Sequence, residues 1–441
     1  MTAILRAAAL VSFCFVFGGV SGEVLAQNTV TSHKRIPQDP AAVALSNTLA
    51  EAQAALDRAD FVTAVSDYQS YLEKRPDDAA VHFQLGYALT GLEKLDEAKV
   101  QYQRAIDLNP KMAEAYLNLG LTLLDSNPSA AIAPLQKATE LLPNQERAKF
   151  ALAVAYERIG KASLAIEQYQ AAEKLDGKDF ETHLALARLL LSAGRAADAE
   201  PEFHMALELQ KNSIPARAGL IQSLTVQKKS EAAARELDAY LELAPNDHGA
   251  RIQRASLLFD AGKPDEALAE LDRASKDNTE DLPALKLRAI IYAQKKQYSD
   301  AIPVLVKAIA LAPQDANLPA ELGHAYLEKK DYPNAIPQLI VAMKVNPGSL
   351  DVVSDLVAAE YLNKNYAAAL SGLDFLAQHE TLPLGSWFIR ATCYDKLNQK
   401  APALDAYQRF LQLNKDENSD MYFEAAARSR TLARELKENK R

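Results

Sequence analysis

A spacing of 34 residues between similar segments constrains this sequence more than any other feature. Each segment carries two apolar stripes whose members lie three and four residues apart, which is the spacing of amphipathic helices. Ala79–Met112 shows the arrangement clearly: small residues at Gly86, Ala98 and Ala105 alternate with large apolar residues, and Pro110 ends the segment. The chain is therefore expected to fold as a series of helix–turn–helix repeats stacked on one another.

Eleven such repeats follow one another, and ten of them span 34 residues. The repeat from Ala113 is one residue shorter, with the loss near Asn127 and Pro128. We expect the array to cover residues 45–417, after a polar linker over 27–44 and before a capping helix and tail over 418–441. The repeats begin at Leu45, Ala79, Ala113, Glu146, Phe180, Ile214, His248, Leu282, Ala316, Leu350 and Leu384.

The repeats resemble tetratricopeptide repeats position by position. That family has a large residue at position four, Leu at seven, Gly or Ala at eight, and an aromatic residue or Leu at eleven. Ala follows at twenty and twenty-seven, an aromatic residue or Leu at twenty-four, and often Pro at thirty-two. The resemblance implies an all-α fold: a right-handed superhelical solenoid of about eleven helix–turn–helix repeats with a C-terminal capping helix. The matching residues of three repeats are Tyr116, Leu119, Gly120, Leu123, Ala131, Leu135, Ala138 and Pro143; Leu152, Ala153, Tyr156, Ala165, Tyr169 and Ala172; and Leu322, Gly323, Tyr326, Ala335, Leu339, Ala342 and Pro347.

The small residues at positions eight, twenty and twenty-seven let neighbouring helices approach closely, while large residues fill the gaps between them. Two repeats depart from this pattern. The sixth repeat has Ile221 and Tyr240 at positions eight and twenty-seven, and the tenth has Val357 and Leu376 there. Either these repeats form a hinge or a local change of superhelical pitch, or smaller residues opposite compensate for the added volume.

The first 26 residues have the pattern of a secretory signal peptide. Arg6 precedes an apolar run over residues 7–20, and Val24-Leu25-Ala26 supplies the residues that a signal peptidase recognises. We therefore expect cleavage before Gln27 and a location in a bacterial periplasm or outside the cell. The alternative is an uncleaved N-terminal anchor, although the apolar run is short for a membrane span. No later stretch of the sequence is apolar enough to cross a membrane.

Composition and motifs argue against several classes of function. A formal net charge of −9 does not suit a general nucleic-acid binder, which needs a basic face. The sequence has no glycine-rich phosphate loop, no HExxH pair, no Cys-x-x-Cys pair and no nucleophile elbow. His183 and His204 share one repeat, but position four is usually a core position, so we expect no metal site and no cofactor. The repeats leave no room for a separate catalytic domain, so we do not expect an enzyme.

The resemblance also implies where partners bind. In tetratricopeptide arrays, positions two, five, nine, twelve and thirteen of the first helix of each repeat face a concave groove. The second to fourth repeats present an apolar strip at these positions, with charged residues beside it, which favours an extended or helical peptide as the ligand. The alternative is that large residues at position five are ordinary for the family and partly buried. The predicted groove residues are Phe83, Tyr87, Leu117, Leu121, Leu124, Arg147, Phe150, Val154 and Arg158.

Charged residues of opposite sign gather in the two kinds of turn, which predicts a basic rim and an acidic rim on opposite edges of the array. Acids before a helix and bases after it suit the helix dipole. A basic rim that is free to bind would instead suit anionic lipid headgroups or an acidic polysaccharide. The basic residues, within repeats, are Lys94, Lys161, Arg195, Lys228, Lys229, Lys263, Lys295, Lys296, Lys329, Lys330 and Lys364; the acidic residues, between repeats, are Asp77, Asp78, Asp179, Asp247, Asp281, Asp315, Asp416 and Glu417.

These observations predict a non-enzymatic exported scaffold or adaptor that holds protein partners in its groove. Resemblance to exported tetratricopeptide proteins suggests a place in envelope assembly, secretion or polysaccharide export. The alternative function is direct binding of a glycan or a lipid headgroup at the basic rim.

Overall fold

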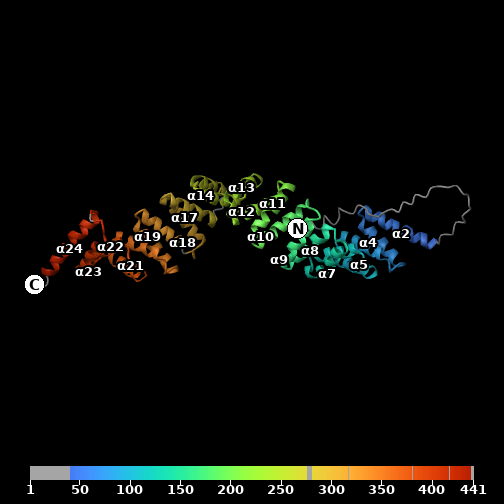
Figure 1. Cartoon of the computed structure of the whole chain (residues 1–441), viewed down its shortest axis with the longest axis horizontal. Coiled ribbons are helices and arrows are strands. Elements are labelled where there is room, and N and C mark those ends of the chain that lie inside the picture. The colour runs from blue at the N-terminus through green and yellow to red at the C-terminus, as the bar shows by residue number, and fades with distance from the viewer. Residues whose placement is uncertain (1–39, 276–280, 316, 380, 417, 439–441) are drawn as a thin grey trace, which may run out of the picture. The chain divides into compact units, whose positions relative to one another are not determined.

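The computed structural model describes residues 40–275, 281–315, 317–379, 381–416 and 418–438. Within these ranges the chain forms 23 α-helices and no strand, and the helices follow one another in chain order (Figure 1). The all-α class and the series of helix–turn–helix repeats are therefore confirmed. The expected signal peptide over 1–26 and the linker residues 27–39 lie outside the described residues.

Each repeat contributes two helices, and one further helix follows the last repeat. The first helices are α2 (Pro40–Asp57), α4 (Ala79–Gly91), α6 (Ala113–Leu123), α8 (Glu146–Arg158), α10 (Phe180–Ser192), α12 (Ile214–Val226), α14 (His248–Asp260), α16 (Leu282–Gln294), α18 (Asn317–Glu328), α20 (Leu350–Leu362) and α22 (Leu384–Lys396). The second helices are α3 (Phe61–Leu72), α5 (Leu95–Leu108), α7 (Pro128–Leu141), α9 (Ala162–Glu173), α11 (Ala196–Leu209), α13 (Ser230–Leu243), α15 (Pro264–Ala274), α17 (Tyr298–Leu311), α19 (Tyr332–Val345), α21 (Tyr366–His379) and α23 (Lys400–Leu413). The last helix is α24 (Asp420–Glu438).

The helical part of the chain begins earlier than the sequence pattern indicates. The expected linker runs to residue 44, but α2 begins at Pro40, so the last five linker residues are helical. Proline suits the first position of a helix because its φ is already near the helical value and its missing N–H needs no partner there. The alanines that follow it are strong helix formers. The apolar pattern did not reveal this first turn because the turn carries no buried stripe.

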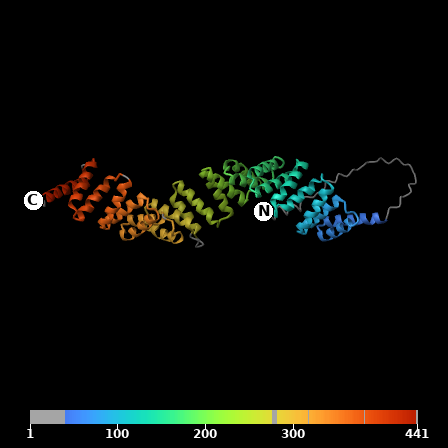
Figure 2. The same cartoon turned by 90° about the horizontal axis from the view of Figure 1, so that it is seen from below.

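The helices group into two compact units, one ending at Glu236 and the other beginning at Leu237, and the division falls within α13. In both units the closest packing is between the two helices of one repeat, as for α4 with α5 and α18 with α19. Packing of the second helix against the next repeat comes next, as for α5 with α6 and α19 with α20. Figure 2 shows the helices from a second side, coloured in chain order. Within each unit, the repeats therefore bury their apolar faces against their neighbours in the chain.

Small residues at the predicted positions allow this close approach. Ala98 and Ala105 are fully buried. A methyl group added at Gly86 would lie 2.8 Å from Cε1 of Tyr102, and one added at Gly323 would lie 2.6 Å from Cγ of a buried leucine in α19. Real side chains do not sit this close, so these positions need the glycine.

One of the two departures from the pattern has a steric compensation. In the tenth repeat, Val357 fills the space in front of Gly372, where a methyl group would contact the valine. In the sixth repeat, the hydroxyl of Tyr240 donates a 2.7 Å hydrogen bond to Asp247, which caps the N-terminus of α14. This bond links the end of α13 to the start of the next repeat.

The turn inside ten of the eleven repeats uses one residue in the left-handed region, at position fifteen. Three of these residues are Gly160, Gly194 and Gly262. The repeat from Ala113 has no such residue: Asn127 has a φ of −153° and caps α7 directly through the N–H of Ala130. The missing residue of this repeat is therefore the left-handed one. The other residues with positive φ are Ala59, Glu93, Lys228, Lys296, Lys330, Lys364 and Asn398.

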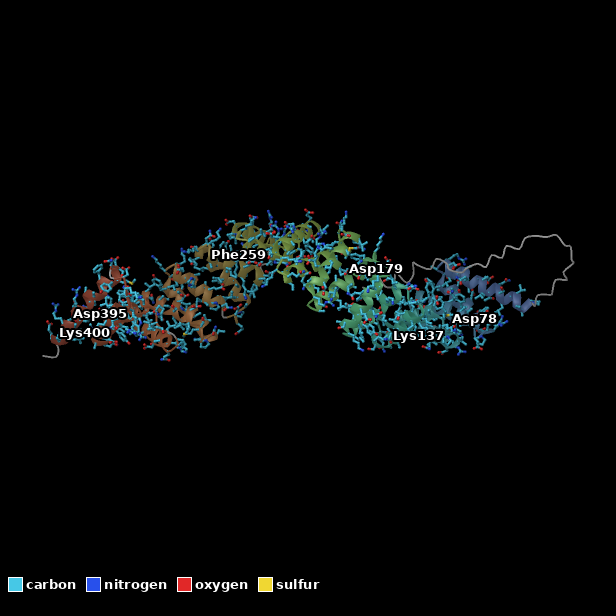
Figure 3. All side chains as sticks on the ribbon, in the orientation of Figure 1. Asp78, Lys137, Asp179, Phe259, Asp395 and Lys400 are labelled. Carbon is cyan, nitrogen blue, oxygen red and sulfur yellow. The ribbon has the colours of Figure 1, made fainter. Side chains whose placement is uncertain are left out.

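Helix α24 closes the C-terminal unit. Its Leu432 is fully buried in the apolar cluster formed with α22 and α23. Arg428 of α24 donates to both carboxylate oxygens of Asp395, at 2.5 and 2.7 Å. Lys400 at the start of α23 pairs with Glu435 of α24 at 3.1 Å, and Figure 3 labels Asp395 and Lys400 at this end of the unit. These ion pairs of Arg428 and Glu435 therefore support the apolar contact of the last helix.

Candidate functional site

Four of the nine predicted groove residues belong to the core. Phe83 is 7% exposed and its ring packs against Tyr102 at a centroid distance of 5.9 Å. Leu117, Leu124 and Val154 are also buried, with Val154 only 1% exposed. The expected apolar strip is therefore not an open patch, because these four side chains are buried.

Four others are half-buried and present part of their surface: Tyr87 of α4, Leu121 of α6, and Arg147 and Phe150 of α8. The ring of Phe150 meets that of Tyr169 edge to face at 5.5 Å, which fixes its orientation. These side chains come from the first helices of three successive repeats, so they form a short row. This row, Tyr87–Leu121–Arg147–Phe150, is called the groove row below.

The charge of Arg147 is the main polar feature of the groove row. Burial lowers the pKa of its guanidinium, and the nearby phenols of Tyr87 and Tyr102 and the carboxylate of Glu146 offset this only in part. Burial also raises the pKa of Tyr87, and the charge of Arg147 opposes that shift. A partly desolvated guanidinium beside a phenol is well placed to donate hydrogen bonds to an acidic group of a ligand.

Arg158, the ninth predicted groove residue, has a structural role. It donates to the carbonyl of Leu124 and pairs with Asp125 at 2.7 Å. Both partners lie at the end of α6, one repeat earlier, so this arginine ties consecutive repeats together. Its donors are directed to the protein itself.

The acidic turn residues act mainly as helix caps. Asp78 accepts from the N–H groups of two residues of α4, and Asp179 accepts from the N–H of Thr182. Asp247 and Asp281 cap α14 and α16 in the same way. Side-chain acceptors satisfy N–H groups that have no partner within the helix. The acidic rim therefore follows from helix capping.

Many basic residues of the other rim are paired with neighbouring acids. Five of them form ion pairs of 4.0 Å or less. Three pair with an acid in the first turn of the helix that follows, and two pair with an acid of the preceding repeat. These pairs are Lys94–Glu97, Arg195–Asp198, Lys263–Glu266, Lys229–Glu200 and Lys295–Asp265. These pairs neutralise five of the eleven basic residues of the rim.

Four repeats share a hydrogen-bonded clamp that the sequence pattern did not reveal. The residue at position four donates to a carbonyl six residues before it and contacts a polar side chain nineteen residues after it. These clamps are His82 with Pro76 and Gln101, His183 with Gly177 and Glu202, Arg217 with Lys211 and Glu236, and Arg251 with Pro245 and Glu270. We call them position-four clamps; they tie both helices of a repeat to the turn before it.

Among the described residues, the His, Cys, Asp and Glu side chains gather in one group with metal-ligand spacing: Glu173, His183 and Glu202, whose ligand atoms lie within 4.8 Å of one another. His204, the partner considered from the sequence, is exposed. The two carboxylates were missed because they come from the preceding helix and the following helix and form no sequence motif with His183.

A hollow of about 550 Å³ lies between α5, α6 and α7, outside the predicted groove positions. Its apolar lining includes Val100, Leu119 and Pro134, and its polar lining includes Lys99 and Arg104. Across the described residues, the helices are too short or too polar to serve as a membrane span.

Comparison with known families gave matches along most of the array. Profiles described as tetratricopeptide repeat match residues 49–98, 125–180, 184–248 and 252–316, and a further profile of this description matches 386–416. A profile described as TPR repeat matches residues 88–126. The first profile alone covers more than half of the chain.

Comparison with solved structures also gave matches. MamA (residues 41 to the end) from Desulfovibrio magneticus RS-1 is 22% identical, with a TM-score of 0.37, over 38% of this chain and 96% of that chain. YrrB, described as a TPR protein with an unusual peptide-binding site, is 22% identical, with a TM-score of 0.39, over 42% of this chain and 96% of that chain. Comparison with curated protein sequences gave no match.

Proposed function

Because the chain belongs to the tetratricopeptide repeat family, we propose that it is a non-enzymatic scaffold that binds protein partners through its groove row. The observation that carries this proposal is the placement of Tyr87, Leu121 and Phe150, which are half-buried on the first helices of three successive repeats. Rigid, partly exposed apolar side chains in a row suit a ligand that runs across several repeats.

A peptide is the ligand class that fits this row best. Its apolar side chains would contact Leu121 and Phe150, and an acidic or carbonyl group would meet the guanidinium of Arg147. The row is small because Phe83, Leu117, Leu124 and Val154 are buried. The energy of binding should therefore be concentrated in a few half-buried anchors.

We place this scaffold in the periplasm or outside the cell. The support is the N-terminal pattern of a positive residue, an apolar run and a cleavage sequence before Gln27. Envelope assembly, secretion or polysaccharide export are the processes in which such a scaffold would act. Separating periplasmic, membrane and secreted fractions, with N-terminal sequencing of the protein recovered, tests this placement. Recovery in the cytoplasm with an intact leader would contradict it.

The test of the function is capture of partners from the envelope fraction with the chain from Gln27 onward. The variant combines Tyr87→Glu, Leu121→Glu and Phe150→Glu, which places charge at all three apolar anchors. Val100→Glu is the matched control, because Val100 is 63% exposed on α5, the second helix of its repeat. A partner that the wild type and the control retain and the triple variant loses supports the proposal. Equal capture by all three proteins refutes it.

The alternative of direct glycan or lipid-headgroup binding predicts a different result. Binding to vesicles that contain anionic lipid, or to an acidic polysaccharide, would then persist in the triple variant and weaken with salt. The ion pairs of the basic rim, such as Lys229–Glu200, reduce the charge available for this mode.

A further inference from the structure

The position-four clamps differ in the charge that they place against a polar partner near the core. Arg217 and Arg251 place a fixed positive charge against Glu236 and Glu270, and Glu270 is only 2% exposed. His82 needs no such charge, because its partner is the neutral amide of Gln101. The buried carboxylate of Glu270 and the partly buried one of Glu236 thus each face a permanent cation, which offsets the cost of removing their charge from water.

The clamp of the fifth repeat lacks a permanent cation. His183 is 2% exposed, and its Nδ1 lies 2.7 Å from Oε2 of Glu202. A second carboxylate, from Glu173 at the end of α9, completes a group whose ligand atoms all lie within 4.8 Å of one another. Two carboxylates therefore converge on one imidazole, which is an arrangement that attracts an exchangeable cation.

The hydrogen bond on the far side of the ring prepares Nδ1 for this role. Nε2 of His183 lies 3.1 Å from the carbonyl oxygen of Gly177. A carbonyl and a carboxylate both only accept, so without a metal ion Nε2 and Nδ1 each carry a hydrogen. A metal ion would replace the hydrogen on Nδ1 and bind to its lone pair. A histidine that binds a metal ion usually donates its other N–H to such a carbonyl, which fixes the tautomer and the ring orientation.

We propose that Glu173, His183 and Glu202 form a binding site for a divalent transition-metal ion, with Zn²⁺ as the best match. An imidazole nitrogen and carboxylate oxygens are both zinc ligands, and three protein ligands with a water molecule in the fourth position make up the usual open zinc site. Glu202 is 16% exposed on its side chain, so the site has access to solvent. Tetrahedral zinc needs the nitrogen and oxygen ligands about 3.3 Å apart. The 2.7 Å between Nδ1 of His183 and Oε2 of Glu202 is shorter, so the Glu202 carboxylate would have to move outward to admit the ion.

The ion would join three helices from two repeats. Glu173 ends α9 in the fourth repeat, whereas His183 of α10 and Glu202 of α11 belong to the fifth. Metal binding would therefore stabilise one repeat interface by linkage. This site is separate from the groove row and does not depend on the function proposed above.

The test uses the untagged chain from Gln27 onward, after treatment with a chelator, and titration with ZnCl₂ by calorimetry. We expect one ion per chain, with at least tenfold weaker binding in His183→Gln and in Glu202→Gln. His82→Gln is the matched control, since it removes a clamp of the same geometry that has no carboxylate, and it should leave zinc affinity unchanged. Zinc should also raise the unfolding temperature of the wild type but not of His183→Gln.

A further variant tests whether the cation at this site is a metal ion or a proton. His183→Arg copies the clamps of Arg217 and Arg251, so it should fold without metal and should no longer bind zinc. X-ray absorption of the zinc-loaded wild type should show one imidazole and two carboxylate ligands. No stoichiometric zinc binding by the wild type, or full zinc binding by His183→Arg, would overturn the proposal and leave a structural clamp that a proton completes.

Discussion

Replacing Glu146 by glutamine is expected to stabilise the N-terminal unit above neutral pH and to have little effect in acid. Oε1 of Glu146 lies 3.3 Å from Oγ1 of Thr182, which also lies 2.6 Å from Oδ2 of Asp179. The hydroxyl has one proton and cannot donate to both carboxylates. If Glu146 is protonated, it donates to Thr182 while Thr182 donates to Asp179, and all three groups are satisfied.

The size of the effect follows from the proton affinity of this carboxyl group. Burial, followed by the charge of Asp179, raises the pKa of Glu146 from 4.5 to about 7. The folded chain therefore holds this proton more tightly than the unfolded chain. The stabilisation from this proton is complete below 4.5, the pKa of Glu146 in the unfolded chain, and is lost as the pH rises through about 7. The shift corresponds to at most about 3.4 kcal/mol. Partial exposure of the side chain and its place at the N-terminus of α8 reduce the expected effect to about 1–2 kcal/mol.

Urea denaturation of the wild type and Glu146→Gln at pH 8 and pH 4 measures this effect. The glutamine amide donates to Thr182 without a charge, so the variant should gain about 1–2 kcal/mol at pH 8 and nearly nothing at pH 4. Glu114→Gln is the control, because Glu114 is an exposed acid in the first turn of α6. A loss of stability in Glu146→Gln at pH 8, or a gain of equal size at both pH values, would refute this reasoning.

Three further predictions test packing, turn geometry and charge. Gly323→Ala should lower the free energy of unfolding of the C-terminal unit, measured in urea, by about 1–2 kcal/mol, because its methyl group would overlap Leu339 of α19. A smaller loss would mean that α18 and α19 move apart easily. Lys296→Gly should raise the free energy of unfolding by about 0.5–1 kcal/mol, because φ is +56° there and glycine adopts this conformation without strain. Gly194→Ala should lower the free energy of unfolding by a similar amount, because φ is +76° there. The hydrogen bond that Nδ1 of His324 donates to the carboxylate of Asp355 raises the pKa of His324, and NMR titration should show this pKa falling in Asp355→Asn. The stabilisation from that pair is present in acid and lost as the pH rises through the raised pKa.

The sequence predicts the helices well because their packing depends on local residue size. Ala98 and Ala105 occupy positions where only small side chains fit, and the structure buries both completely. The extent of the groove was harder to predict. Phe83 and Phe150 both occupy position five of their repeats, yet only Phe83 is buried. Position within a repeat indicates the direction of a side chain but not how far the next repeat covers it.

Contacts between repeats explain what remained hidden in the sequence. Glu173 and Glu202 lie on either side of His183 along the chain, in different helices, and no spacing rule connects them. The acid at position twenty-three becomes informative only when position four is seen to face it, as Arg217 faces Glu236. Positions eight, twenty and twenty-seven are fixed by packing, whereas four and twenty-three are free to carry different chemistry. Features particular to this chain are therefore to be sought where the repeat pattern leaves the residue type open.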